Sequence, residues 1–149
     1  MIVLSQILLG GISTQVQSTE SGIVLKRDNH FNTICAKRNT KFIQPGQFRY
    51  STTLLKKAMT SGNVLLIKDI EEIKDPSKSI QDHNMKSVLI SPVMTSSDCY
   101  GGLVLWRDIS IPYTDDDMNW ISNITLMLAG TLEKEKLKKE IQMSHEKNK

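Results

Sequence analysis

The chain has 149 residues, of which 39% are hydrophobic and 23% are charged. This length and composition predict one globular domain with a single core and exclude collagen-like, membrane-embedded and disordered classes. The formal net charge is +3, from 19 basic and 16 acidic residues, and the two kinds are interleaved. Because a nucleic-acid-binding surface needs a one-sided basic patch, no nucleic-acid partner is expected.

Two cysteines, Cys35 and Cys99, stand far apart, without a second pair or a nearby histidine ligand. This pattern predicts free thiols in a reducing, cytoplasmic compartment, and neither a zinc site nor a disulfide framework. The apolar start, residues 1–10, lacks a basic region and a cleavage site and is followed by a second glycine at Gly11. We therefore expect a packed helix there, rather than a signal peptide or a membrane span.

The first predicted element is a helix over residues 2–16, where apolar residues recur at three- and four-residue spacings. Two short β-branched runs follow, at residues 21–27 and 31–36. Between them stands Asp28-Asn29-His30, which is turn chemistry. The two runs are therefore expected to form a hairpin.

A helix and a strand are predicted next, after a loop that contains Pro45-Gly46. Ser51 is expected to cap the helix, which stops at Ser61-Gly62. Residues 64–67 form a short apolar run that predicts a buried strand. The polar stretch 71–85 predicts a long loop with a short helix, and loops of this length commonly serve as lids or binding segments.

A second hairpin is predicted from the strands 87–94 and 101–106, joined by a turn at residues 96–99. Pro92 lies inside the first of these strands and predicts a sheet edge or a bulge at that point. The total is five strands with a helix at each end and one in the middle. No internal repeat is visible.

The last predicted helix runs from Asp115 to about Ser144, with Thr114 as its N-cap. Its apolar residues between 120 and 132 cover much more than one stripe, so both sides are expected to be buried. One side can meet the sheet, and the other predicts a homodimer through the terminal helices. The alternative is a helix enclosed by its own domain. The residues expected at the dimer interface are Ile7, Trp120, Ile124, Met127 and Leu128.

Beyond residue 132 the pattern changes to Glu/Lys pairs around Leu137 and Ile141. We expect residues 1–132 to form the domain and residues 133–149 to form a charged helical extension. It is interpreted either as a coiled-coil connector to another domain or, equally, as a charged tail that frays.

Three stretches, in this order, resemble the GAF family of sensory domains. Residues 51–69 are similar to the family's helix, Ser/Thr-Gly pair and strand ending in Asp. Residues 85–93 look like its strand with a basic residue, Ser, apolar residues and Pro. The third stretch joins Tyr100-Gly101-Gly102 and the strand after it to Tyr113-Thr114 and three Asp residues, similar to the family's Gly-strand and aromatic-Thr-x-x-Asp motif.

The resemblance implies an α+β fold, with a central antiparallel sheet of five to six strands. It places the terminal helices on one face, and loops and short helices that close a pocket on the other. It also implies a module of signal transduction that binds a small ligand or dimerises and controls an attached or partner output domain. The helix from Ser51 onward most resembles the version in adenylyl cyclases and enhancer-dependent transcription activators, which implies bacterial signalling and transcription regulation.

The residues expected to bind a ligand come from a strand end, the long loop and the second hairpin. They are Lys68, Asp69, His83, Ser87, Ser91 and Arg107. His83 could titrate near neutral pH or bind an anion, although a lone histidine in a polar loop is more often only solvated. Asp69 is expected to be an exposed turn or capping residue.

The sequence does not match the motifs by which some members of the family bind cyclic nucleotides, attach a bilin or reduce methionine sulfoxide. Cyclic-nucleotide binders carry an Asn-Lys pair where this chain has Trp106-Arg107. Bilin-binding members use a cysteine commonly followed by His, whereas Tyr100 follows Cys99, and Cys35 is expected in a strand. GAF-like methionine sulfoxide reductases need close cysteines. With no catalytic triad, phosphate loop or metal-ligand cluster, we expect no enzyme activity, metal or cofactor.

Two hypotheses follow. The first is a sensory module whose pocket, roofed by residues 71–85, takes a small molecule and alters the bundle of terminal helices. The alternative is a ligand-free dimerisation and scaffold domain, whose pocket has collapsed around large side chains such as Met85, Met94 and Phe42.

Overall fold

The structure is a computed structural model that describes residues 2–69 and 85–147. The predicted loop at residues 71–85 thus lies outside the described residues, apart from Met85. In chain order the described elements are α1 (Ile2–Gln15), β1 (Glu20–Arg27), β2 (His30–Arg38), β3 (Lys41–Ile43), the short 3-10 helix η1 (Pro45–Gln47), α2 (Thr52–Ser61), β4 (Leu65–Ile67), β5 (Ser87–Met94), β6 (Cys99–Arg107) and α4 (Asp115–Lys147).

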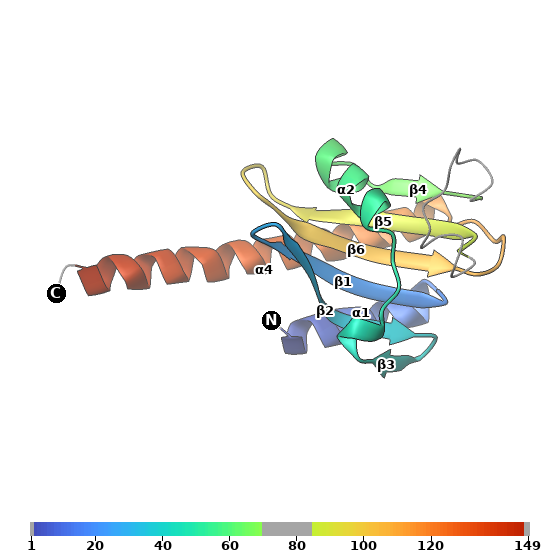
Figure 1. The fold of residues 1–149 in the computed structure, drawn as a ribbon, viewed down its shortest axis with the longest axis horizontal. Coiled ribbons are helices and arrows are strands. Elements are labelled where there is room, and N and C mark those ends of the chain that lie inside the picture. Colours follow the sequence, from blue (N-terminus) through green and yellow to red (C-terminus); the bar gives the residue numbers. More distant parts are fainter. Residues whose placement is uncertain (1, 70–84, 148–149) are drawn as a thin grey trace.

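The strands form one antiparallel sheet in the order β3-β2-β1-β6-β5-β4. Figure 1 shows α2 on one side of this sheet and α4 and α1 behind it. The expected α+β fold, with both terminal helices on one face, is confirmed. β3 is an additional strand in a stretch expected to be a loop. Three residues are too few to show an alternating pattern, and the pairing with residues 36–38 defines the strand.

Alternate residues of each strand face opposite sides of the sheet and build two hydrophobic cores. On the terminal-helix face, Leu9 of α1 and Leu128 of α4 pack with Leu103. On the α2 face, Leu55 of α2 packs with Trp106. Because the sheet is covered on both faces, its central strands lack the alternation of polar and apolar residues that a solvent-exposed face would produce.

The turns follow the chemistry that the sequence predicts. Asp28 begins the β1–β2 turn with a φ of 56°, a left-handed conformation that Asp tolerates better than most residues. The Leu54 N–H donates to Ser51 Oγ at 3.2 Å and so caps α2, and Gly62 ends this helix with a φ of 71°. The first hairpin and both ends of the middle helix are confirmed.

The far side of the sheet differs in detail. β4 is an edge strand, in which only Ile67 is buried, rather than the buried strand expected. β4 pairs only with residues 88–90 of β5, so Pro92 lies where β5 has no outer strand partner among the described elements, and a register shift follows one residue later. Of the two alternatives expected at Pro92, the edge is confirmed, and the bulge lies between Val93 and Met94. Cys99, expected in the turn, is the first residue of β6.

The last helix begins where the sequence predicts. The Asp117 N–H donates to Thr114 Oγ1 at 3.1 Å, and the Thr114 N–H donates to Asp117 Oδ2 at 2.9 Å, which forms a reciprocal cap. The C-terminal half of α4 runs far past the sheet (Figure 1). Leu137 and Ile141 of this part are exposed. Among the described residues, no helix has the length and apolar character needed to cross a bilayer.

Only one side of α4 is buried within the chain. Ile124 and Leu128 are 6% and 0% exposed, whereas Trp120 and Met127 are 41% and 61% exposed. The alternative in which the domain's own chain encloses this helix is therefore wrong for the described structure.

Candidate functional site

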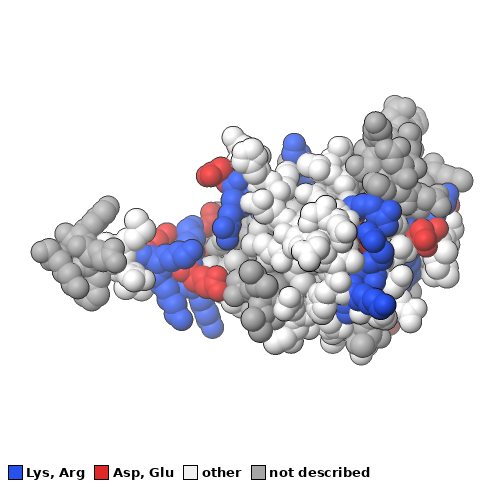
Figure 2. All heavy atoms as spheres, turned by 60° about the horizontal axis from the view of Figure 1, so that its bottom comes forward, with Lys and Arg blue, Asp and Glu red and all other residues white. Residues whose placement is uncertain are grey.

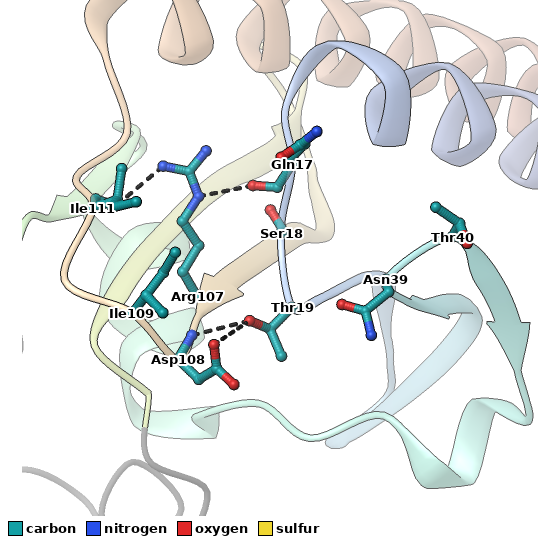
Figure 3. A pocket seen from close by; sticks show the side chains of 9 residues that line it. All are labelled: Gln17, Ser18, Thr19, Asn39, Thr40, Arg107, Asp108, Ile109 and Ile111. Carbon is teal, nitrogen blue, oxygen red and sulfur yellow. Dashed lines mark hydrogen bonds between the residues drawn. The ribbon is translucent and has the colours of Figure 1, made fainter.

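A pocket of about 450 Å³ opens at the end of the sheet where β6 stops and β1 begins. Three segments line this sheet-end pocket: residues 17–19 of the α1–β1 connection, Asn39 and Thr40 of the β2–β3 turn, and residues 107–109 and Ile111 at the start of the β6–α4 connection. Figure 3 shows their side chains around the opening. Both connections that lead to the terminal helices thus meet at one site.

Arg107, the last residue of β6, ties these two connections together. Its Nε donates to the Gln17 carbonyl at 2.8 Å, and its Nη1 donates to the Ile111 carbonyl at 3.1 Å (Figure 3). Nη1 also donates to the Pro112 carbonyl at 3.2 Å. Its guanidinium carbon lies 4.0 Å from the centre of the Tyr113 ring, a cation–π contact. Only arginine has a planar fork of donors that can reach several acceptors in fixed directions.

Thr19 holds Asp108 in place in the wall of the sheet-end pocket. Its hydroxyl donates to Asp108 Oδ1 at 3.1 Å and accepts from the Asp108 N–H at 3.0 Å. The Thr19 N–H donates to the Trp106 carbonyl, and the Asn39 N–H donates to the Thr19 carbonyl, both at 2.9 Å. The ends of β1, β2 and β6 are therefore held together around the pocket.

Tyr113 anchors the two connections from beneath. It is 2% exposed, and its hydroxyl shares a hydrogen bond of 2.8 Å with Ser18. Burial raises the pKa of Tyr113, opposed by the bond to Ser18 and by the Arg107 charge. The phenol therefore stays neutral at physiological pH and acts as a hydrogen-bonding anchor.

The chemistry of the pocket is mixed. It offers the Arg107 cation, the Asp108 carboxylate and the polar side chains of the β2–β3 turn, beside Ile109 and Ile111, which are 51% and 55% exposed. Its volume falls in the range of roughly 300–1,000 Å³ that small-molecule sites occupy. Within the part of the chain that the structure describes, no three potential metal ligands come together. The arrangement suits noncovalent binding of a small polar molecule with an apolar portion.

Arg107 is the predicted ligand-binding residue that the structure places in this pocket. Ser87 and Ser91 are instead 0% and 2% exposed, and their hydroxyls join structural elements. Ser87 Oγ donates to the Lys68 carbonyl, and Ser91 Oγ shares a hydrogen bond with Thr125 Oγ1 of α4, both at 2.8 Å. Strand alternation puts Ser91 on the terminal-helix face, and the sequence does not assign a strand residue to a side.

The other candidates follow β4. Lys68 is exposed and Asp69 half-buried, and neither lines the sheet-end pocket. Ser87 bonds to the Lys68 carbonyl and is the ladder partner of Arg107, so these three residues lie along neighbouring strands at one end of the sheet. His83 lies outside the described residues.

The α2 face bears on the collapsed-pocket hypothesis. Met85 is 2% exposed and belongs to the core of that face, as the hypothesis expects, and Met94 is half-buried. Phe42 is 49% exposed, and the Lys37 ammonium lies 5.0 Å from the centre of its ring, so Phe42 fills no pocket there. A hollow of about 360 Å³ remains at the β2 end of this face, beside Phe48.

Sequence reasoning missed a buried charge cluster at the start of β1. Glu20 is 0% exposed, and its carboxylate accepts from the Arg49 N–H at 3.2 Å and from Arg49 Nε at 2.6 Å. Arg38 Nε lies 3.7 Å from the same carboxylate. The Arg49 carbonyl accepts the Trp106 indole N–H at 2.7 Å. A single Glu before a strand gives no signal in the sequence, because its partners stand far along the chain.

The two thiols are not activated. Burial is the main cause that raises the pKa of both Cys35 and Cys99. A reactive cysteine needs the opposite shift, because the thiolate is the nucleophile.

No protein-family model matches the sequence, and no curated protein matches it. Solved structures do. The blue-light-absorbing form of the PixJ GAF domain from Thermosynechococcus elongatus is 12% identical, with a TM-score of 0.73 over 96% of this chain and 90% of that one. The GAF domain of a two-component sensor histidine kinase from Bacillus halodurans is 14% identical, with a TM-score of 0.63 over 89% and 95%. The GAF domain of a phosphoenolpyruvate-protein phosphotransferase from Coxiella burnetii is 10% identical, with a TM-score of 0.68 over 92% and 84%. The likeness shows that this chain has the GAF fold.

Proposed function

We propose that this chain is a cytoplasmic regulatory module that binds a small polar molecule in the sheet-end pocket. It passes the event through its terminal helices, as a homodimer, to an attached or partner output domain. Domains of two-component sensor histidine kinases share the fold, which supports a signalling role. The observation that carries the proposal is Arg107, which lines the pocket and bonds both connections to the terminal helices.

Transmission follows from these contacts. Gln17 lies two residues after α1, and Pro112 lies three residues before α4. A ligand that moves the Arg107 guanidinium therefore changes contacts next to both helices at once. Such a ligand can shift the equilibrium between two arrangements of the helices only as far as it binds one arrangement more tightly than the other.

The exposed side of α4 supports the homodimer. Trp120, Met127, Leu137 and Ile141 are 41%, 61%, 48% and 66% exposed. In a heptad frame that begins at Trp120, all four stand at a or d positions, and the remaining a and d positions are Asn123, Gly130 and Lys134. Ile7 of α1 is a further exposed apolar residue, 66% exposed. Ile124 and Leu128, also expected at the interface, belong to the chain's own core.

A thermal-shift screen of nucleotides, amino acids and 2-oxo acids tests the binding site. A ligand at 100 times its Kd stabilises the folded state by about 2.7 kcal/mol. The pocket-filling variant Thr40→Trp should abolish the shift, whereas Thr60→Trp, on the exposed side of α2, should keep it. A screen without a stabilising compound, or a compound whose effect survives Thr40→Trp, would contradict the proposal.

One observation favours a second function, a ligand-free dimerisation domain. Apart from the hollow beside Phe48, the core of the α2 face is filled by its own side chains, Leu55, Met85 and Trp106 among them. In that case the chain dimerises without a ligand. Thr40→Trp then changes neither the unfolding temperature in the thermal-shift screen nor self-association.

A further inference from the structure

The outer edge of β2 is open over most of its length. β1 pairs along one side of β2, whereas β3 pairs only with residues 36–38 on the other. Among the described elements, no strand pairs with the outer side of residues 30–35. Figure 1 shows β3 as a short arrow beside one end of β2. The 3-10 helix η1 contacts β2 but forms no strand ladder with it. An edge without a ladder partner is a template for another strand.

The hairpin register identifies the backbone groups that face this edge. Arg27 and His30 flank a two-residue turn and form a hydrogen-bonded pair. Pairs alternate from there, so Lys26 and Phe31 form a non-hydrogen-bonded pair. The N–H and C=O groups of Phe31, and of Thr33 two residues on, therefore point away from β1 toward the open edge.

The hollow of about 360 Å³ lies beside these groups. Phe31 and Thr33 line it from β2, and Pro45 lines it from η1. Phe48 and Tyr50 complete it with stacked rings, whose centres are 5.4 Å apart. Alternate side chains of an added strand point to the same face, so one of them would enter this aromatic hollow.

Basic side chains flank the hollow. Lys26 is the ladder partner of Phe31 at one end of β2. At the other end, Arg38 and Lys41 are ladder partners in the β2–β3 pairing. Lys26 and Lys41 are exposed, and Asp28 in the turn is a carboxylate at this edge. Figure 2 brings this side of the sheet forward and shows Lys and Arg side chains, with fewer Asp and Glu side chains among them, on both sides of a largely uncharged region. The charge distribution favours an acidic occupant.

We propose that an extended segment of a partner protein adds as a strand to the outer edge of β2 and seats an aromatic side chain in the hollow beside η1, with acidic residues at its two ends. Main-chain hydrogen bonds to Phe31 and Thr33 supply affinity in this mode, and the hollow and the basic ends supply specificity. The surface is distinct from the sheet-end pocket, since the two share no lining residue.

The test uses the full chain and fluorescein-labelled seven-residue peptides with a central Phe, Tyr or Trp, alternating Thr and Val, and Glu at both ends. Control peptides carry Ala at the centre or Lys at the ends. Fluorescence anisotropy should show the aromatic acidic peptides binding at least about ten-fold more tightly than either control.

Two pairs of variants locate the binding. Thr33→Pro removes an outward N–H at a strand edge, where proline is tolerated, and Thr33→Val keeps it. Gly46→Trp fills the hollow and Gly46→Ala leaves it open, and a Cβ at Gly46 meets no atom within 4 Å. We expect the Pro and Trp variants to weaken binding about ten-fold or more, and the Val and Ala variants to match the parent.

Circular dichroism checks that each variant folds, and if Thr33→Pro does not, the Gly46 pair decides. The proposal is overturned if no peptide of the set binds at millimolar concentration, or if binding survives Gly46→Trp. It is also overturned if sedimentation shows that Thr33→Pro reduces self-association, because the edge then belongs to a second copy of the chain.

Discussion

At Glu20 a carboxylate is fully buried beside two arginines whose side chains remain 35% and 40% exposed. Buried charges are tolerated only when paired, so the cost of breaking this cluster depends on which partner is removed. Loss of an arginine leaves a charge in the core, whereas loss of the carboxylate leaves charges that water can reach.

We expect Arg49→Met to lower the free energy of unfolding by about 3 kcal/mol, because it removes the closer of the two arginines and leaves the buried Glu20 carboxylate with Arg38 Nε at 3.7 Å. Glu20→Gln should cost about 1 kcal/mol, since the amide oxygen still accepts a hydrogen bond. Urea unfolding measures both, with the exposed Lys56→Met as the control. Equal losses in the two variants would show that the carboxylate is not isolated from water.

Tyr100 makes the free energy of unfolding depend on pH in the alkaline range. Its hydroxyl donates to Glu133, and this bond, with burial, raises the pKa of Tyr100 from 10.0 to about 12. The folded state holds the proton more tightly than the unfolded state, so this stabilisation is fully present below pH 10 and is lost between pH 10 and about 12. In urea unfolding across that window, Tyr100→Phe should show a smaller fall in stability than the parent. An identical fall in both would show that Tyr100 does not cause this pH dependence.

Gly101 is a residue that the sequence indicates as part of a motif, whereas the reason for a glycine there lies in the folded structure. In the sequence, the Gly101-Gly102 pair stands out only as part of the family motif. A Cβ at Gly101 would lie 2.0 Å from the Val24 carbonyl oxygen, and its φ is 152°. The contact comes from β1, far away in the chain, so its reason becomes visible only when the strands are paired.

Among the elements, those with local chemical signals were predicted well. Ser51, Gly62 and Thr114 mark helix ends at the residues where the structure has them, because capping needs only neighbouring residues. The sequence does not predict β3, and it predicts β4 as a buried strand rather than an edge strand, because strand order depends on long-range pairing.

The cap of α2 can be tested alone. Ser51→Ala removes the acceptor of the Leu54 N–H and should cost about 1 kcal/mol in urea unfolding. Thr53→Ala, one exposed residue inside the same helix, should change stability by much less. Equal costs would argue against the cap.

The β5–β6 hairpin is fastened to α4 where the helix leaves the sheet. Asp98 pairs with Lys136, and Tyr100 with Glu133. Surface pairs contribute little to global stability, roughly 0–1 kcal/mol, but they can hold a helix in place locally. We expect the double variant Tyr100→Phe with Lys136→Ala to raise hydrogen exchange of α4 beyond residue 132 about ten-fold, with little change in global stability. Lys138→Ala is the control, and unchanged exchange in the double variant would show that the hairpin does not hold α4.

For the whole molecule, the fold could be predicted and the site only in part. Sheet, layers and terminal helices follow from hydrophobic patterns and the GAF resemblance. The sheet-end pocket is built from three connections that meet only after folding, so the sequence indicated Arg107 but not Thr19 or Asn39. The position of Ser87 and Ser91 in the sequence suggests ligand contacts. In the folded chain the Ser87 hydroxyl bonds to the Lys68 carbonyl and the Ser91 hydroxyl bonds to Thr125.

The exposed side of α4 is where the proposed signal leaves the domain, and sedimentation velocity of the full chain tests it most directly. We expect a dimer, and a monomer for Met127→Glu, which places a charge on the exposed stripe without touching the core. Asn119→Glu, on an exposed position before that stripe, should remain dimeric. A parent chain that stays monomeric at high concentration, or a Met127→Glu variant that still dimerises, would contradict this account.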